Sequence, residues 1–192
     1  AINNIGTGDS IDFSKPFLMV MHHPVTTESD NRAHTEALLG AVGSLHTQTI
    51  WFWPNSDAGT GEMAKAIRIY REVAQANHHA IKFVTDMLPE DFIAVLRRAS
   101  CLIGNSSAGI KESSYLGTPV VNVGSRQSGR LRGPNVVDVG YGKDEIKNAI
   151  EKQVAHGAYP SSDLYYKPNA SKKIVEILKK IPLYSQKKFY ES

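Results

Sequence analysis

The chain has 192 residues, of which 41% are hydrophobic and 21% are charged, a composition typical of globular proteins and unlike that of disordered or fibrous chains. Its 22 Lys and Arg residues against 19 Asp and Glu residues give a net charge of +3, which is too small to indicate a nucleic-acid partner. At roughly 150 residues per domain, the length predicts one domain with short appendages, able to form a core without disulfides.

Cysteine usage and hydropathy restrict the compartment. The single cysteine, Cys101, lies in an apolar stretch and has no intrachain disulfide partner. This indicates a reducing compartment, and we expect a cytoplasmic protein. No stretch approaches the 18 apolar residues of a membrane span, and the first residues lack the basic and apolar regions of a signal peptide. We therefore predict no membrane partner and no export signal.

Short apolar runs alternate with longer amphipathic segments along most of the chain. The runs predict strands at 17–21, 50–53, 81–84, 101–103, 119–123 and 136–139. The amphipathic segments predict helices at 28–45, from Asp57 or Thr60 onward, at 89–98, from Ser106 or Ser107 to Gly117, and at 143–154. Strict alternation of strands and helices predicts an α/β fold, a Rossmann-like parallel sheet with helices on both faces.

The remaining segments flank this domain. Residues 1–15 contain the flexible run Gly6–Ser10, and we expect a linker there. The Rossmann-like domain then spans 16–157, and 158–192 form a C-terminal loop and helical tail. Within this tail, a helix is predicted over 171–180, stopped by Pro182 and carrying lysines on a solvated face.

Ligands of open α/β sheets bind outside the carboxyl ends of the strands. This rule selects five loops, at 22–28, 54–59, 85–88, 104–109 and 124–130. All five are rich in side chains that hydrogen-bond phosphates or hydroxyl groups. We therefore expect a ligand site along this edge of the sheet.

The loop Gly104–Gly109 is the strongest signal, because it lies directly between a strand and a helix. Its small residues allow close backbone approach, and the amides and dipole at the helix start, near Ser106 and Ser107, suit an anion. The glycine spacing is that of an ATPase P-loop, but Ile110-Lys111 replaces the required Lys-Ser/Thr pair. The sequence therefore predicts an anion-binding site that differs from an ATPase P-loop. A Ser residue that only caps the helix would give the same sequence pattern.

Three further side chains suit a nucleotide diphosphate. Glu112 can accept hydrogen bonds from a ribose diol, and the Arg126 guanidinium matches the geometry of phosphate oxygens. His23 can bond a phosphate because Pro24 turns the chain directly after it, whereas His22 and His23 point to opposite faces and cannot chelate one metal ion. Each residue alone also suits a surface or structural role; their combination at successive strand ends predicts a nucleotide-diphosphate pocket.

Four segments carry a family resemblance. The segments 23–28, 54–59, 104–112 and 117–130 resemble the C-terminal half of hydrolysing UDP-N-acetylglucosamine 2-epimerases, which begin sialic acid synthesis. The match runs in order from about residue 16 to residue 140, and its last motif, Gly117–Arg130, is long and specific. The resemblance implies a GT-B architecture, in which two Rossmann-like domains face each other across a cleft and this chain is the nucleotide-binding domain.

The resemblance also implies residue roles, with UDP and UDP-N-acetylglucosamine as ligands. His23 and Arg126 would contact the diphosphate and act in catalysis, and the other substrate-binding residues would be Asn55 near the sugar and phosphate, Met87 beside the uracil, Ser106 and Ser107 at phosphate, and Glu112 at the ribose. No cofactor is implied. Because the chain contains no Asp-x-Asp motif, we expect protein cations rather than a metal ion to neutralise the diphosphate.

The implied reaction eliminates UDP and then adds water, giving N-acetylmannosamine and UDP. The acid and base carboxylates of this family belong to an N-terminal domain. We therefore expect this chain alone to bind UDP weakly and not to turn over substrate. The alternatives are the nucleotide-sugar domain of a GT-B glycosyltransferase and a stand-alone nucleotide sensor. A diacetamido trideoxy sugar as substrate and a homo-oligomeric assembly also remain open.

Overall fold

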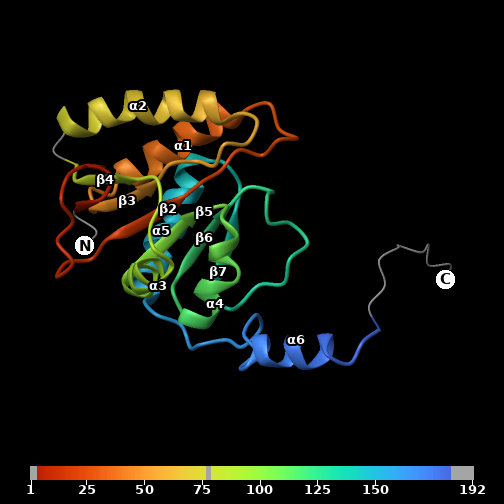
Figure 1. The fold of residues 1–192 in the computed structure, drawn as a ribbon. Coiled ribbons are helices and arrows are strands. Elements are labelled where there is room, and N and C mark those ends of the chain that lie inside the picture. Colours follow the sequence, from red (N-terminus) through yellow and green to blue (C-terminus); the bar gives the residue numbers. More distant parts are fainter. Residues whose placement is uncertain (1–3, 77–78, 183–192) are drawn as a thin grey trace.

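The computed structural model describes residues 4–76 and 79–182, with only the backbone at 75 and 76. Within these residues, one seven-stranded sheet has the order β1-β4-β3-β2-β5-β6-β7 (Figure 1). The strands are β1 (Thr7–Gly8), β2 (Leu18–Met21), β3 (Thr49–Phe52), β4 (Ile81–Val84), β5 (Cys101–Gly104), β6 (Val120–Val123) and β7 (Val136–Val139). All neighbours pair in parallel except β1, which runs antiparallel to β4. The predicted parallel sheet is therefore confirmed, with one additional edge strand.

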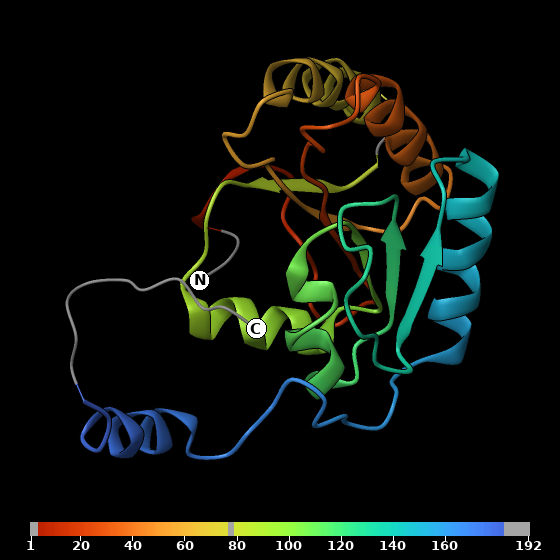
Figure 2. The same ribbon diagram turned by 90° about the vertical axis from the view of Figure 1, so that its right-hand side faces the viewer.

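Helices cover both faces of the sheet (Figure 2). They are α1 (Asn31–Gly43), α2 (Thr60–Ala76), α3 (Pro89–Arg98), α4 (Glu112–Leu116), α5 (Lys143–His156) and α6 (Ala170–Leu178). Side chains of α1, α2 and α5 pack in one core cluster and those of α3 in the other. The fold is thus an α/β sandwich of three layers, as the alternation of elements predicts.

The two cores follow from the alternation of side chains along each strand. Leu18 and Val20 point into one cluster and Met19 into the other. Trp51 is fully buried in the cluster beside α1 and α2, and the neighbouring Trp53 is partly buried against it. Strands buried on both faces account for the continuous apolar runs in the sequence.

The segment 1–15, which the composition predicts to be a linker, contributes to the sheet. Residues 7–8 form β1, and Ile11 is buried in the core. Gly6 has a φ of +72°, and a Cβ on it would lie 2.0 Å from the Phe83 carbonyl oxygen. The glycines that suggest flexibility therefore permit close approach of two backbones. Residues 1–3 lie outside the described part of the chain.

The predicted helix 106–117 is divided into the 3₁₀ helix η2 (Ser107–Gly109) and α4. Gly109 packs against Val120, where a Cβ would lie 3.0 Å from Val120 Cγ1, and Ile110 is fully buried. The predicted continuous helix is thus interrupted at this close contact. Gly117 ends α4 with a φ of +71°, as expected of a helix C-terminal glycine.

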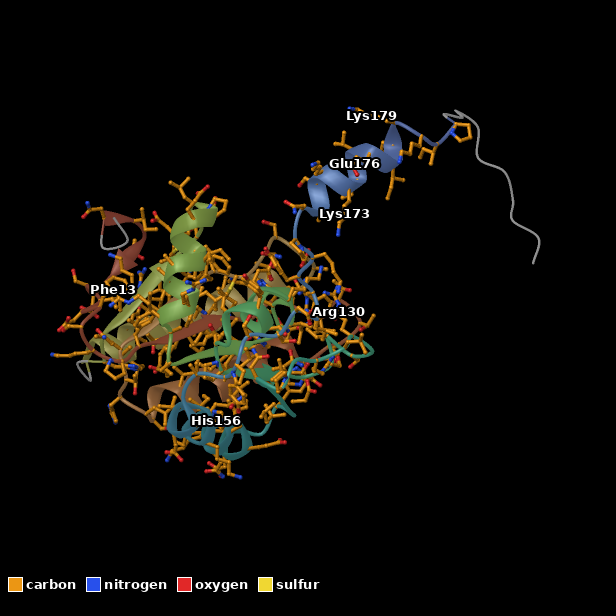
Figure 3. The ribbon with its side chains drawn as sticks, turned by 90° about the horizontal axis from the view of Figure 1, so that it is seen from below. Phe13, Arg130, His156, Lys173, Glu176 and Lys179 are labelled. Atoms are coloured by element: carbon orange, nitrogen blue, oxygen red, sulfur yellow. The ribbon has the colours of Figure 1, made fainter. Side chains whose placement is uncertain are left out.

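The C-terminal segment first crosses the domain and then leaves it. Tyr159 N donates to Gly117 O at 2.8 Å and Ser162 N to Ser114 O at 3.0 Å. Helix α6 has no buried residue and stands apart from the domain, with Lys173, Glu176 and Lys179 at its surface (Figure 3). The predicted tail 158–192 extends beyond the described residues at 183–192. None of the helices in the described part of the chain is long and apolar enough to cross a membrane.

Candidate functional site

The strand order reverses direction between β2 and β5. Strand β2 pairs with both β3 and β5, so the chain proceeds outward in opposite directions from this point. Loops that leave neighbouring strands in opposite directions create the crevice in which open α/β sheets bind ligands. The loop after β2 carries His22 and His23, and the loop after β5 begins at Asn105.

Asn105 joins these two loops. It is fully buried, its Oδ1 accepts from His23 N at 2.7 Å, and its Nδ2 donates to His23 O at 2.8 Å. Its carbonyl oxygen accepts from Gln127 Nε2 at 2.7 Å and from Arg126 Nη1 at 3.3 Å. Asn105 therefore holds together the segments after β2, β5 and β6.

Asn105 and Gln127 were not among the site residues inferred from the sequence. The available signal was an amide side chain at a strand end inside Gly104–Gly109, where a buried polar group must find partners. Pattern reasoning could identify the motif, but the partners depend on how the loops fold.

His23 is a neutral hydrogen-bond donor in this site. The side chain is 5% exposed, and its Nδ1 accepts from Asn55 N at 3.2 Å. Burial lowers the pKa of His23 to about 4, aided by the nearby Arg126 and opposed by Asp57. At neutral pH the proton is therefore assigned to Nε2, which can donate to a ligand oxygen.

Arg126 supplies the cation of the site. Its side chain is 29% exposed, and Nη2 lies 3.9 Å from Asp57 Oδ2. The hydrogen bond from Nη1 to Asn105 O orients the guanidinium, which carries five donors in total. The remaining donors can bind phosphate oxygens, and the Asp57 carboxylate competes with the phosphate for these donors.

A cavity of about 330 Å³ lies beside His23. It brings together three predicted site residues, His23, Asn55 and Met87. The other lining residues are Met21, Phe52, Trp53, Thr85, Asp86, Pro89 and Phe92. Apolar and aromatic walls beside hydrogen-bond donors suit a flat heterocycle attached to a phosphate.

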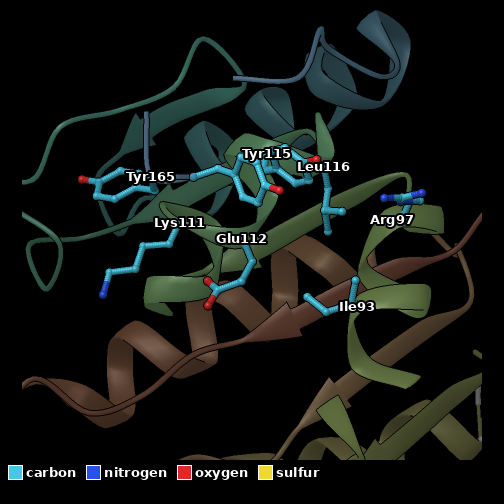
Figure 4. A pocket seen from close by; sticks show the side chains of 8 residues that line it. Ile93, Arg97, Lys111, Glu112, Tyr115, Leu116 and Tyr165 are labelled. Atoms are coloured by element: carbon cyan, nitrogen blue, oxygen red, sulfur yellow. The ribbon is translucent and has the colours of Figure 1, made fainter. Parts of the chain in front are cut away.

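Glu112 lies elsewhere. It is the exposed first residue of α4 and lines a second cavity of about 440 Å³ (Figure 4). In this view Glu112 lies between Lys111 and Ile93, and its carboxylate points away from Ile93. Glu112 is therefore not among the residues that line the cavity beside His23, and its role at a ribose stays a prediction.

Ser106 and Ser107 follow Asn105 at the start of η2. Ser106 Oγ accepts from Ala108 N at 3.3 Å, so Ser106 is the N-cap of η2, the role that the sequence allows as the alternative to an anion site. Because η2 has only three residues, the large helix dipole expected here is not formed. An anion at this place would depend on individual amides and hydroxyl groups.

Three further candidates for a chemical role are a metal-ligand cluster, His22 and Cys101. Within residues 4–76 and 79–182, no three His, Cys, Asp or Glu side chains gather to hold a metal ion. Burial lowers the pKa of His22 to about 3, with smaller contributions from His23, His34 and Arg126. Burial also raises the pKa of the Cys101 thiol, so this cysteine is not a reactive nucleophile.

Comparisons with known proteins give a family. A family model described as UDP-N-acetylglucosamine 2-epimerase matches residues 3–179. The chain is 31% identical over 176 residues to the UDP-N,N'-diacetylbacillosamine 2-epimerase (hydrolyzing) of Legionella pneumophila, covering 91% of this chain and 45% of that protein. It is 32% identical over 146 residues to the UDP-N-acetylglucosamine 2-epimerase of Neisseria meningitidis, covering 76% and 37%.

Solved structures agree on the fold. The N. meningitidis UDP-GlcNAc 2-epimerase bound to UDP-GlcNAc aligns with a TM-score of 0.65 at 16% identity, over 89% of this chain and 46% of that one. The enzyme from Methanocaldococcus jannaschii aligns with a TM-score of 0.64 at 15% identity, over 88% and 46%.

These matches confirm the predicted fold class, one Rossmann-like domain of a GT-B architecture. The chain spans less than half the length of the curated relatives it matches, consistent with the predicted C-terminal half. Because the family model matches most of its length, the chain belongs to the UDP-N-acetylglucosamine 2-epimerase family.

Proposed function

We propose that this chain is the UDP-sugar-binding half of a hydrolysing UDP-N-acetylglucosamine 2-epimerase. The observation that carries the proposal is the convergence of His23 and Arg126 on Asn105 at the carboxyl ends of β2 and β5. The His23 side chain lines a cavity that suits a uracil ring, and Arg126 supplies further donors through its contact with Asn105. Family membership supports the same ligand.

The proposed reaction begins with elimination. The bond between C1 of the sugar and the β-phosphate oxygen breaks, the electron pair goes to the phosphate, and the proton on C2 goes to a base outside this chain. Arg126 and the Nε2 proton of His23 would stabilise the negative charge on the departing phosphate. Removing one such donor typically costs about 3 kcal/mol of transition-state stabilisation. Water then adds to the enol ether, giving N-acetylmannosamine.

The other residues have binding roles in this proposal. Asn55 and Met87 line the cavity with His23 and would contact the sugar-phosphate and the uracil. Ser106 and Ser107 would bind phosphate through hydroxyl groups and amides. Glu112 would reach the ribose hydroxyl groups from α4. No step requires a cofactor or metal ion from this chain.

Titration of UDP into the 192-residue chain tests the binding role. We expect Arg126→Ala to weaken UDP binding by about 100-fold, because the diphosphate then loses its guanidinium partner in a partly buried site. Arg130→Ala is the matched control, since Arg130 is exposed on the same loop. Absence of UDP binding by the unaltered chain, or equal affinity of Arg126→Ala and Arg130→Ala, would overturn the proposal.

A second assay separates the epimerase from a glycosyltransferase. A protein that includes both domains is incubated with UDP-N-acetylglucosamine and no acceptor. Free N-acetylmannosamine identifies the epimerase, and an intact donor identifies the transferase. The Legionella relative is named for a diacetamido substrate, so UDP-N,N'-diacetylbacillosamine is the comparison substrate.

A further inference from the structure

A carboxylate outside the proposed contact residues joins three loops of the site. Glu28 Oε1 accepts from Ser125 Oγ at 2.5 Å, and Glu28 Oε2 accepts from Tyr141 OH at 2.7 Å. These partners lie 97 and 113 residues further along the chain, after β6 and β7. His34 Nδ1, on α1, lies 3.5 Å from the same Oε2. Both carboxylate oxygens of Glu28 are thus engaged.

The surroundings of Glu28 hold it in this position. Asn31 Nδ2 donates to the Glu28 carbonyl oxygen at 2.9 Å, which folds the end of the loop after β2 onto α1. The rings of His34 and Tyr141 stack at 3.5 Å between centroids with an angle of 1° between their planes. Gly124 has a φ of +77°, and a Cβ there would lie 2.1 Å from Tyr141 OH. Only glycine at 124 leaves room for the tyrosine to reach the carboxylate.

Ser125 is the residue directly before Arg126, so the contact of Ser125 with Glu28 restrains the backbone that carries the Arg126 guanidinium. On its inner side, the loop is attached to Asn105 O through Arg126 and Gln127. On the other side, the loop is attached to Glu28 through Ser125, and Glu28 is held in turn by Tyr141 from the segment after β7. We infer that Glu28 is a positioning residue for Arg126, fixing the loop so that the guanidinium faces the phosphate. This inference rests on the proposed binding of UDP.

A carboxylate suits this role better than a neutral acceptor. Hydrogen bonds to an ionised acceptor are shorter and stronger than those between neutral groups. Burial raises the pKa of Glu28, but the hydrogen bonds from Ser125 and Tyr141, with His34, outweigh burial and leave that pKa below its ordinary value. The carboxylate therefore stays ionised at neutral pH and keeps both acceptors.

A double-mutant cycle on the 192-residue chain tests the inference. Dissociation constants for UDP and uridine are measured by NMR titration for the unaltered chain, Glu28→Ala, Arg126→Ala and the double variant. We expect Glu28→Ala to weaken UDP binding roughly tenfold, and to change it less than about twofold when Arg126 is already alanine. Uridine, which has no phosphate, should bind Glu28→Ala as it binds the unaltered chain. Glu28→Gln, which keeps one neutral acceptor oxygen, should restore only part of the affinity.

The controls separate the possible outcomes. Asp30→Asn removes a nearby exposed carboxylate that forms no cap hydrogen bond, and it should bind UDP normally. Equal affinities of Glu28→Ala and Asp30→Asn would overturn the inference, as would equal losses for UDP and uridine or equal losses with and without Arg126. If Glu28→Ala fails to fold, Ser125→Ala and Tyr141→Phe take its place in the same cycle. Absence of UDP binding by the unaltered chain would overturn the proposed function and this inference with it.

Discussion

At the scale of single residues, two adjacent histidines are buried at the end of β2. His22 is 2% exposed and His23 is 5% exposed, and burial lowers their pKa values to about 3 and about 4. In the unfolded chain, an ordinary histidine titrates near pH 6.5. Between about pH 6.5 and pH 4, the unfolded state therefore binds more protons than the folded state.

This difference predicts a pH-dependent stability. Because the unfolded state binds more protons in this window, the free energy of unfolding rises with pH and falls on acidification. From pH 7.5 to pH 5.5, we expect a loss of about 3 kcal/mol from the two histidines together, measured by urea denaturation. His22→Phe, which replaces one ring with a nontitrating one, should lose about half of that pH dependence. A stability that is constant over this range would contradict the burial of neutral rings.

At the scale of elements, α5 packs against the core whereas α6 is exposed along its whole length. Ile150 of α5 is fully buried, whereas Ile177 of α6 is 58% exposed. We expect Ile150→Ala to lower the free energy of unfolding by about 3 kcal/mol, since it leaves a cavity in the core. Ile177→Ala should change it by less than about 0.5 kcal/mol. Similar losses for both variants, in urea unfolding, would show that α6 packs on the domain.

Predictability from sequence also differs between elements. Apolar runs and helical periodicity locate β2 to β7 and most helices within a few residues, because burial against two layers constrains each position. Strand β1 is not predicted by this pattern, since its two residues, Thr7 and Gly8, are exposed and pair with β4 through their backbones. The break between η2 and α4 is not predicted from the sequence either. It lies where Gly109 packs closely against Val120, a tertiary contact that helical periodicity does not report.

The site shows the same division. The rule for strand ends, which depends only on topology, selects the loops that carry His23, Asn55 and Met87, and these three residues line one cavity. Asn105 and Glu28 act through partners as far as 113 residues away, in loops whose conformations the pattern does not encode. The strand ends that could meet a ligand can thus be inferred from the sequence, whereas the side chains that hold the loops together cannot.

At the scale of the whole molecule, the chain is short relative to its family. It covers 45% of the Legionella relative and 46% of the solved N. meningitidis enzyme. We expect the 192-residue chain, incubated with UDP-N-acetylglucosamine, to release no UDP above the buffer rate, because the proposed base for the C2 proton lies outside it. A coupled assay for UDP measures this. Release that disappears in Arg126→Ala would contradict the prediction and place the complete chemistry within this chain.

The short strand β1 has a consequence for self-association. It covers the outer backbone groups of β4, which would otherwise form an open edge of the sheet. An uncovered edge strand is a template on which a second chain can add a strand and begin a fibril. Gly6 and Gly8 have φ values of +72° and +97°, so replacements that look harmless in an exposed segment would detach this cover. The colloidal stability of the protein thus depends on a few residues that contribute little to its core.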